Sequence, residues 1–158
     1  AKSFNLASSD IIAFIDADLS VGPEYLPRML SMLKDADIVV GSRYLPESQS
    51  RRNILRLIFS RTAGAFTRAY FNSKLTDHQC GLKAFRRDVI LELVGEAGYD
   101  KTLARGFAWD TEILVRAQRK GYRIVEVPVK WTESGRSSVK PLRDWKVIPY
   151  TIALKKRL

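Results

Sequence analysis

The chain has almost none of the residues that build disulfides, zinc sites or histidine-based catalysis. Its 158 residues include one cysteine, Cys80, and one histidine, His78. A single cysteine excludes a disulfide within the chain, and this pair is too few for a Cys/His zinc site. A Ser-His-Asp triad is disfavoured for the same reason. We expect Cys80 to be a small buried residue, with a thiol-imidazole pair to His78 as the alternative. Any catalysis is therefore expected to depend on carboxylates and cations.

The sequence also lacks any apolar run near the roughly 20 residues that cross a bilayer, and it shows no repeat or low-complexity tract. Its length and its 46% hydrophobic residues fit one α/β domain with a real core. The chain has no initiator methionine and no signal-peptide pattern. Because a nucleotide-binding α/β domain needs an earlier β-α-β segment, we expect a fragment whose N-terminal nucleotide-binding segment is missing.

Acidic residues are few relative to basic ones. Lys and Arg total 27 against 17 Asp and Glu, which gives a formal charge of +10. This balance favours an anionic partner such as a membrane surface, a nucleic acid or a phosphate-rich substrate. The basic residues are interleaved with aliphatic ones and form no recognisable nucleic-acid motif, so nucleic acid is the weakest of these partners.

An apolar run that ends in two carboxylates organises the rest of the chain. Residues 9–18 read Ser-Asp-Ile-Ile-Ala-Phe-Ile-Asp-Ala-Asp, which predicts a fully buried strand of a parallel sheet, with a buried helix segment as the alternative that periodicity leaves open. Asp16 and Asp18 then lie at its carboxyl end, where open α/β sheets bind ligands. Two hard oxygen ligands there suit Mg²⁺ or Mn²⁺ with positions left open for a diphosphate. The alternative is that both residues cap a helix or make a turn.

A second strand is predicted at residues 37–41, after a short helix near residues 24–33. It leads into Ser42 and Arg43, again at a carboxyl end. An arginine there can bind phosphate oxygens in a bidentate manner, and its alternative role is a salt bridge to a loop carboxylate.

The remaining segments predict three helices and one strand. Residues 51–71 form a basic amphipathic helix whose Leu55, Ile58, Phe59 and Phe66 pack on the core or face lipid. We further expect helices at 87–94 and 109–120, and a strand at 122–129 whose Pro128 indicates an edge position or a bulge.

The C-terminal part is polar and then amphipathic. The loop at 132–140 carries Arg136, Ser137 and Lys140, which could close over phosphates; otherwise it is a surface linker. Residues 141–158 suit an interfacial helix interrupted near Pro149, and so a peripheral membrane protein.

Taken in order, five motifs resemble those of the family-2 glycosyltransferases, closest to the dolichyl- and polyprenyl-phosphate mannose or glucose synthases, and they span almost the whole chain. They are Asp16-Ala17-Asp18, Gly41-Ser42-Arg43-Tyr44, the stretch from Asp77 to Phe85, Phe107-Ala108-Trp109-Asp110-Thr111-Glu112, and Val127-Pro128-Val129-Lys130-Trp131 followed by Ser137-Ser138-Val139-Lys140.

The resemblance implies a GT-A-like fold, in which helices flank a mixed sheet, with a partial catalytic domain at 1–140. It implies Mg²⁺ or Mn²⁺ at Asp16 and Asp18, and inverting transfer from GDP-mannose or UDP-glucose to a polyprenyl phosphate at the cytoplasmic face of a membrane. Asp77 matches an aspartate that serves as base or orients the acceptor, and Asp110 matches a base of other members. Where the family often adds a metal-binding Gln, this chain has Ser20. The matching substrate-binding residues are Ser42, Arg43, Gln79, Lys83, Arg136, Ser137 and Lys140.

Elementary chemistry favours the phosphate acceptor over a sugar hydroxyl. A hydroxyl needs a general base, whereas a phosphate is already anionic and chiefly needs cations to hold it. The alternative for Asp77 is a turn residue, and for Asp110 an acidic residue that favours the start of a helix. Two other functions stay open. One is a metal-dependent sugar-phosphate nucleotidyltransferase, which predicts a glycine-rich basic phosphate loop in a segment before Ala1 that this sequence does not contain. The other is a non-catalytic binding module.

Overall fold

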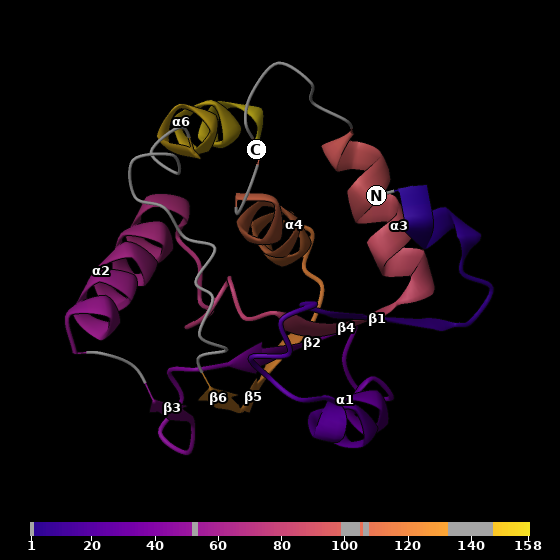
Figure 1. Cartoon of the computed structure of the whole chain (residues 1–158). Helices are drawn as coiled ribbons and strands as arrows, with labels where there is room; N and C mark the ends of the chain where they lie inside the picture. The colour runs from indigo at the N-terminus through magenta and orange to yellow at the C-terminus, as the bar shows by residue number, and fades with distance from the viewer. Residues whose placement is uncertain (1, 52–53, 99–104, 106–107, 133–146) are drawn as a thin grey trace.

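Short strands and amphipathic helices alternate along most of the chain. Figure 1 shows the computed structural model, which describes residues 2–51, 54–98, 105, 108–132 and 147–158. The elements are η1 (Lys2–Leu6), β1 (Ile11–Ile15), η2 (Pro23–Tyr25), α1 (Leu26–Met32), β2 (Ile38–Ser42), β3 (Gln49–Arg51), α2 (Ile54–Phe71), β4 (Leu82–Arg86), α3 (Arg87–Ala97), α4 (Ala108–Arg119), β5 (Ile124–Pro128), β6 (Lys130–Thr132) and α6 (Val147–Arg157).

The central sheet is mixed, as predicted, with the strand order β1-β4-β2-β5. Strand β4 runs antiparallel to both β1 and β2, and β5 runs parallel to β2. Ile15 pairs with Leu82, and Val40 pairs with Lys83. The carboxyl ends of β1 and β2 therefore meet the start of β4 at one edge of the sheet. Strands β3 and β6 form a separate two-stranded sheet.

The prediction that β1 is a fully buried strand of a parallel sheet is wrong. Within the described residues β1 lies at the edge of the sheet, and of its five residues only Ile12 is buried. Its neighbour is β4, a strand that the sequence pattern did not predict. The prediction for Pro128 is confirmed, because β5 is the opposite edge strand of the four-stranded sheet.

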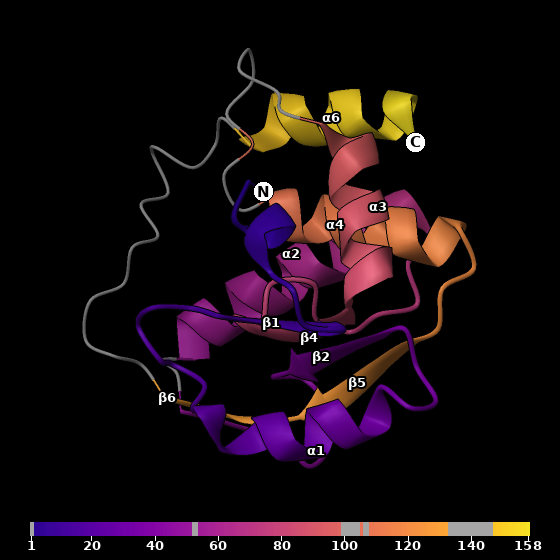
Figure 2. The same ribbon diagram turned by 90° about the vertical axis from the view of Figure 1, so that its right-hand side faces the viewer.

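Helices cover both faces of this sheet. Figure 2 shows α1 on one face and α3 and α4 on the other. One core cluster joins the sheet to α3 and α4 and includes Ile38, Phe85 and Leu114. A second joins the sheet to α1 and includes Met29 and Leu82. Helix α3 runs three residues beyond its predicted end at Val94 and closes at Gly98, whose φ of 61° suits glycine.

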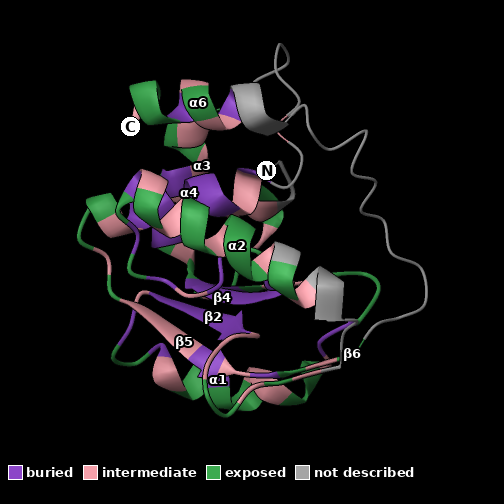
Figure 3. Cartoon of the chain, turned by 90° about the vertical axis from the view of Figure 1, so that its left-hand side faces the viewer, coloured by how far each residue is buried: buried purple, intermediate pink, exposed green. Residues whose placement is uncertain are grey.

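Helix α6 packs on α4 and on the end of α2. Its Tyr150 and Leu154 are buried against Phe71, Ala108 and Val115. Pro149 lies in the first turn of α6, where no helical N–H partner is lost. Residues 141–146, the first part of the predicted helix, lie outside the described residues, so the interruption near Pro149 stays a prediction. Figure 3 shows exposed stretches on α2 and α6 along one side of the molecule. No helix in the described part of the chain is both long and apolar enough to cross a membrane.

Candidate active site at the carboxyl edge of the sheet

Strand β1 ends in a tight turn that displays two carboxylates. The backbone N–H of Leu19 donates to the carbonyl of Asp16 at 3.0 Å, and the N–H of Ser20 donates to Asp18 Oδ1 at 3.0 Å. Leu19 adopts a left-handed φ of 49°, which is strained for a leucine. Both aspartate side chains are exposed. The turn alternative for Asp18 is thus correct for one of its oxygens, and the metal role of both residues stays a prediction.

Asp16 lies in a crowded electrostatic environment. Its N–H donates to the carbonyl of Gly81 at 2.8 Å, and a Cβ on Gly81 would lie 2.1 Å from Asp16 Oδ2. Burial raises the pKa of Asp16 above its ordinary value; Lys83 opposes the rise, and the carboxylates of Asp110 and Asp18 add to it. The ionised form of Asp16 is therefore less favourable than that of an ordinary exposed aspartate.

These residues fit a divalent ion that is shared with a substrate. The described residues contain no group of three Asp, Glu, His or Cys side chains that could enclose a metal by themselves. Mg²⁺, however, is commonly bound by one or two carboxylates together with substrate phosphates and water. Two exposed carboxylates, one of them with a raised pKa because burial and neighbouring carboxylates disfavour its charge, match that kind of site.

A buried lysine joins the Asp16 region to helix α4. The Lys83 side chain is only 1% exposed, and its Nζ lies 2.8 Å from Asp110 Oδ1. The same Nζ donates to the carbonyl of Cys80 at 2.5 Å and lies over the ring of Phe14. Asp110 is in the first turn of α4, as the sequence predicts. Lys83 thus serves as an internal counter-ion, and its substrate-binding role stays a prediction.

Arg43 and Asp77 form a bidentate pair at the end of β2. Arg43 Nε donates to Asp77 Oδ2 at 2.6 Å and Nη2 donates to Oδ1 at 2.7 Å. The backbone N–H groups of Arg43 and Gln79 also donate to this carboxylate, both at 3.0 Å. Asp77 is buried, yet the hydrogen bonds and charge of Arg43 outweigh desolvation and hold its pKa below the ordinary value. The salt-bridge alternative for Arg43 therefore describes the structure, and phosphate binding stays a prediction.

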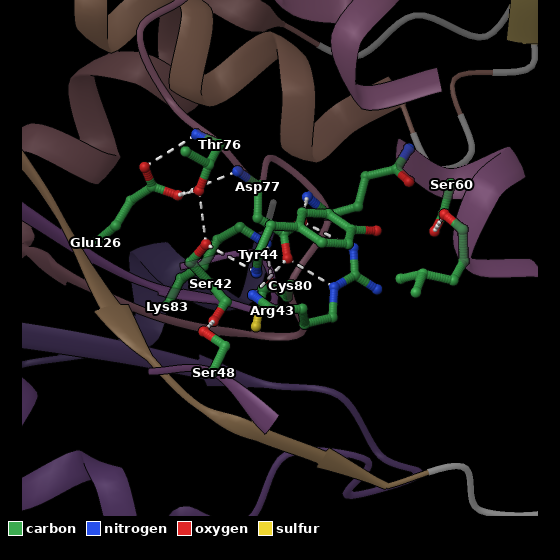
Figure 4. A network of polar contacts seen from close by, with 12 residues as sticks. Ser42, Arg43, Tyr44, Ser48, Ser60, Thr76, Asp77, Cys80, Lys83 and Glu126 are labelled. Carbon is green, nitrogen blue, oxygen red and sulfur yellow. Dashed lines mark hydrogen bonds and ion pairs between the residues drawn. The ribbon is translucent and has the colours of Figure 1, made fainter. Parts of the chain in front are cut away.

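Two residues that the sequence did not single out support this pair. Glu126 on β5 accepts hydrogen bonds from Thr76 and from the N–H of Asp77. The Thr76 hydroxyl lies 2.7 Å from Ser42 Oγ, so Ser42 takes part in the same network (Figure 4). The alternating pattern of β5 marked Glu126 as a polar position, but nothing local indicated a partner 50 residues away.

A small pocket lies beside the Arg43–Asp77 pair. One wall is formed by Ser60, Ala63, Gly64 and Thr67, four small residues that share a face of α2. The rest of the lining comes from the segment after β2, from the loop before β4 and from α4, through Arg43, Tyr44, Thr76, Asp77, His78, Gln79 and Thr111.

The remaining predicted residues have different positions. Gln79 is exposed at this pocket. Cys80 is fully buried, as predicted, and a Cβ on Gly41 would meet its sulfur at 2.8 Å. His78 lies 2.8 Å from Ser73 Oγ, so the structure shows a serine contact where the alternative was a thiol-imidazole pair. The predicted substrate-binding residues Arg136, Ser137 and Lys140 lie outside the described residues.

Sequence comparison places the chain among known transferases. Residues 1–94 match the profile of the family described as glycosyl transferase family 2. The chain is 35% identical over 145 residues to glycosyltransferase AglD of Haloferax volcanii, covering 90% of this chain and 22% of AglD. It is 34% identical over 125 residues to polyprenol monophosphomannose synthase of Mycolicibacterium smegmatis, covering 78% of this chain and 46% of that protein. The chain thus spans less than half the length of these two relatives.

Structure comparison gives the fold. Glucosyl-3-phosphoglycerate synthase of Mycobacterium tuberculosis, solved with Mn²⁺, UDP-glucose and phosphoglyceric acid, superimposes with a TM-score of 0.64 at 19% identity. The match covers 98% of this chain and 52% of that protein. Another structure of the same enzyme holds Mg²⁺ and UDP. At this identity the likeness establishes a shared GT-A-like fold, in agreement with the mixed sheet and its flanking helices.

Proposed function

Because the chain belongs to glycosyl transferase family 2, we propose that it acts as a glycosyltransferase that moves a hexose from a nucleotide sugar to a polyprenyl phosphate with inversion. The family membership and the fold agree with the resemblance drawn from the five motifs. The name of the M. smegmatis relative supports a polyprenol-linked product with mannose as the sugar. Mannose from GDP-mannose and glucose from UDP-glucose are both within the proposal.

The observation that carries the proposal is the meeting of two kinds of charge at one edge of the sheet. Asp16 and Asp18 are exposed at the end of β1, and Arg43 lies at the end of β2. Arg43 is close enough to Asp16 to influence its pKa. The donor diphosphate and the acceptor phosphate are both anions, so an enzyme that brings them together needs cationic groups beside each of them.

Asp16 and Asp18 are the residues that would hold Mg²⁺ or Mn²⁺. When bound, the ion would stabilise negative charge on the departing nucleotide diphosphate. The protein contributes the turn that fixes both carboxylates, the contact between Asp16 and Gly81, and the counter-charge of Lys83. Ser20 is buried, and its backbone N–H donates to Asp18 Oδ1. This agrees with a metal site that does not use the Ser20 side chain as a ligand.

The geometry of Asp77 favours an acceptor that needs no general base. Its two oxygens already accept four hydrogen bonds, from the Arg43 side chain and from the backbones of Arg43 and Gln79. Because its pKa is lowered by that pairing, Asp77 is a weak proton acceptor. Of the two roles that the family resemblance implies, the structure suits orientation of the acceptor through Arg43 better than proton removal.

Asp110 is the second carboxylate, after Asp77, with a proposed role in the reaction. It lies in the first turn of α4, and Lys83 Nζ is 2.8 Å from one of its oxygens. Asp110 also raises the pKa of Asp16, which supports a role for Asp110 near the proposed donor site. We propose that it contacts the transferred sugar while Lys83 keeps the local charge balanced.

A membrane surface is the proposed source of the acceptor. On α2, Ile58 and Phe66 are 57% and 61% exposed, and on α6 Ile152 is 51% exposed. Lys155 on α6 lies over the ring of Tyr70 on α2, so the two helices are neighbours. Exposed apolar residues flanked by cations are typical of helices that lie in a lipid interface. Among the side chains of these two helices that the structure describes, the exposed cations are Arg61, Lys155, Lys156 and Arg157.

The transfer reaction is tested directly. A longer version of the chain, with an N-terminal β-α-β segment, is incubated with Mn²⁺, a short polyprenyl phosphate and labelled GDP-mannose or UDP-glucose. We expect labelled lipid with one of the donors and loss of product on Asp18→Ala. Asp35→Ala, an exposed aspartate beyond α1, is the matched control. Transfer that survives Asp18→Ala would reject the metal assignment.

Membrane contact is tested with vesicles. The chain should sediment with anionic vesicles more than with neutral ones, and Phe66→Glu should weaken that binding. Leu30→Glu changes an exposed leucine on α1, at the opposite face of the sheet, and should leave binding unchanged. Equal losses for the two variants would contradict the proposed surface.

A further inference from the structure

Glu126 is a partly buried carboxylate that the proposed reaction does not yet use. It lies in the middle of β5, at the register position of Val40 on β2. Its Oε2 accepts from the N–H of Thr76 at 2.9 Å, and its Oε1 accepts from the N–H of Asp77 at 3.0 Å. Oε1 also accepts from the Thr76 hydroxyl at 2.6 Å. One side chain thus binds three donors of a turn 50 residues away.

The direction of these hydrogen bonds extends the network to β2. Because the Thr76 hydroxyl donates to Glu126, its oxygen must accept from Ser42, whose Oγ lies 2.7 Å away. The next residue, Arg43, meets Asp77 through its backbone and its guanidinium. The end of β2 is therefore bound twice to the turn that Glu126 holds, as Figure 4 shows.

We propose that Glu126 is a positioning residue, which fixes the Thr76–Asp77 turn so that Asp77 orients the Arg43 guanidinium toward the acceptor phosphate. The role rests on the proposed transferase function. It requires a carboxylate in particular, since a carboxylate offers acceptor sites in all directions. A glutamine at position 126 would have only one side-chain oxygen. Its NH₂ group would then face the N–H of Thr76 or Asp77, or the Thr76 hydroxyl, and at least one of these donors would be left without an acceptor.

The primary test is Glu126→Gln, assayed in the longer version of the chain described above. We expect kcat/KM for the polyprenyl phosphate to fall about 10- to 100-fold, the range typical of groups that orient a catalytic ligand, while KM for the nucleotide sugar stays the same. Glu96→Gln removes a surface carboxylate of α3 by the same chemical change and should have no effect. An unchanged kcat/KM in Glu126→Gln would overturn the role.

A double-variant cycle separates positioning from general support of the fold. If Glu126 acts through Asp77, adding Glu126→Gln to Asp77→Asn should cost little further activity, because the orienting carboxylate is already lost. Fully additive losses would overturn the inference. Thr76→Val keeps the backbone bonds and removes the hydroxyl, so we expect a smaller loss than with Glu126→Gln.

Amide hydrogen exchange gives a readout that does not depend on turnover. In Glu126→Gln the amides of Thr76 and Asp77 should exchange faster than in wild type, whereas in Glu96→Gln they should not. Unchanged protection would overturn the inference even if the chain transfers sugar. Faster exchange in a chain that transfers no sugar would reject the proposed function and retain the role of Glu126 in fixing the turn.

Discussion

The carboxylates at the carboxyl edge of the sheet and the carboxylate between α4 and α6 have opposite environments. At the edge of the sheet, Asp18 is exposed and Asp16 is exposed in part. Partial burial of the Asp16 carboxyl, together with the charges of Asp110 and Asp18, raises its pKa, and Lys83 opposes the rise. Between the helices, Glu112 is fully buried and completely partnered.

Glu112 shows what the chain does with a carboxylate that serves the fold. Arg105 donates to it at 2.8 Å and Arg116 donates at 3.0 Å, while the Tyr150 hydroxyl of α6 donates to the same group. Arg105 also binds the carbonyls at the end of α3, at Ala97 and Gly98. The described residues give Asp16 and Asp18 no comparable set of hydrogen-bonded cations, which agrees with the proposed cation site at these two carboxylates.

Asp16→Asn tests the first half of this comparison and has the largest expected effect. Transfer should fall about 10³-fold, since a metal ion stabilises several kcal/mol of charge in the transition state. Thermal stability should stay the same or rise, because a neutral isostere removes the cost reflected in the raised pKa of Asp16. Activity at saturating Mn²⁺ and the melting temperature are the two measurements. A lower melting temperature would show that Asp16 serves the fold.

Glu112→Gln tests the second half. Removing this charge leaves two arginines without their buried partner, and breaking such a pair costs about 3–5 kcal/mol. We expect that loss in urea unfolding. Glu92→Gln alters an exposed ion pair with Lys120 and should leave stability nearly unchanged. Comparable losses from both variants would remove the distinction between the two regions.

Gly81→Ala changes the geometry of the edge without changing its charge. The added Cβ would lie 2.1 Å from Asp16 Oδ2 and 2.7 Å from Asp16 Cβ, so the carboxylate must turn away. Misplacement by about 1 Å costs up to about 10²-fold in rate, and the Mn²⁺ concentration for half-maximal activity should rise. Gly95→Ala fills open space in α3 and is the control. Unchanged metal dependence in Gly81→Ala would contradict the placement of the ion.

The carboxylates at the strand ends could be predicted from sequence because their signal is local. An apolar run that stops at Asp16 and Asp18 places them at a strand end whatever the strand's neighbours are, and the same holds for Arg43 after β2. The wrong part of the β1 prediction, its burial in a parallel sheet, was not local. It depended on β4, whose Leu82–Arg86 sequence includes a buried lysine.

Partners distant in the chain escaped prediction for the same reason. Lys83 breaks the apolar pattern of β4, and its burial makes sense only with Asp110 placed 2.8 Å away by α4. Glu126 reads as an ordinary polar residue of an edge strand until its contacts with Thr76 and Asp77 are known. Patterns within a segment indicate what an element is, whereas a buried charge is explained by a tertiary contact.

His78 lies where the two regions meet and gives the smallest expected effect. Its Nε2 is 2.8 Å from Ser73, whose hydroxyl donates to Gln118 of α4, so the imidazole nitrogen is the donor in that contact. Burial lowers the pKa of His78 to about 4, Arg68 and Lys83 add to the lowering, and Asp77 opposes it.

The sign of the pH effect follows from this lowered pKa. The unfolded chain takes up the proton near pH 6.5 and the folded chain only near pH 4, so stability falls as the pH drops through this interval. Between pH 7.5 and 5.5 we expect a loss of about 1 kcal/mol in the free energy of unfolding. His78 is the only histidine in the chain, so His78→Asn should flatten the profile there. The raised pKa of Asp16 gives a pH dependence of the opposite sign, so Asp16 would account for any rise in the free energy of unfolding that remains in His78→Asn as the pH drops. If His78→Asn still shows the full loss of about 1 kcal/mol expected of the wild type, another group is responsible for the pH effect.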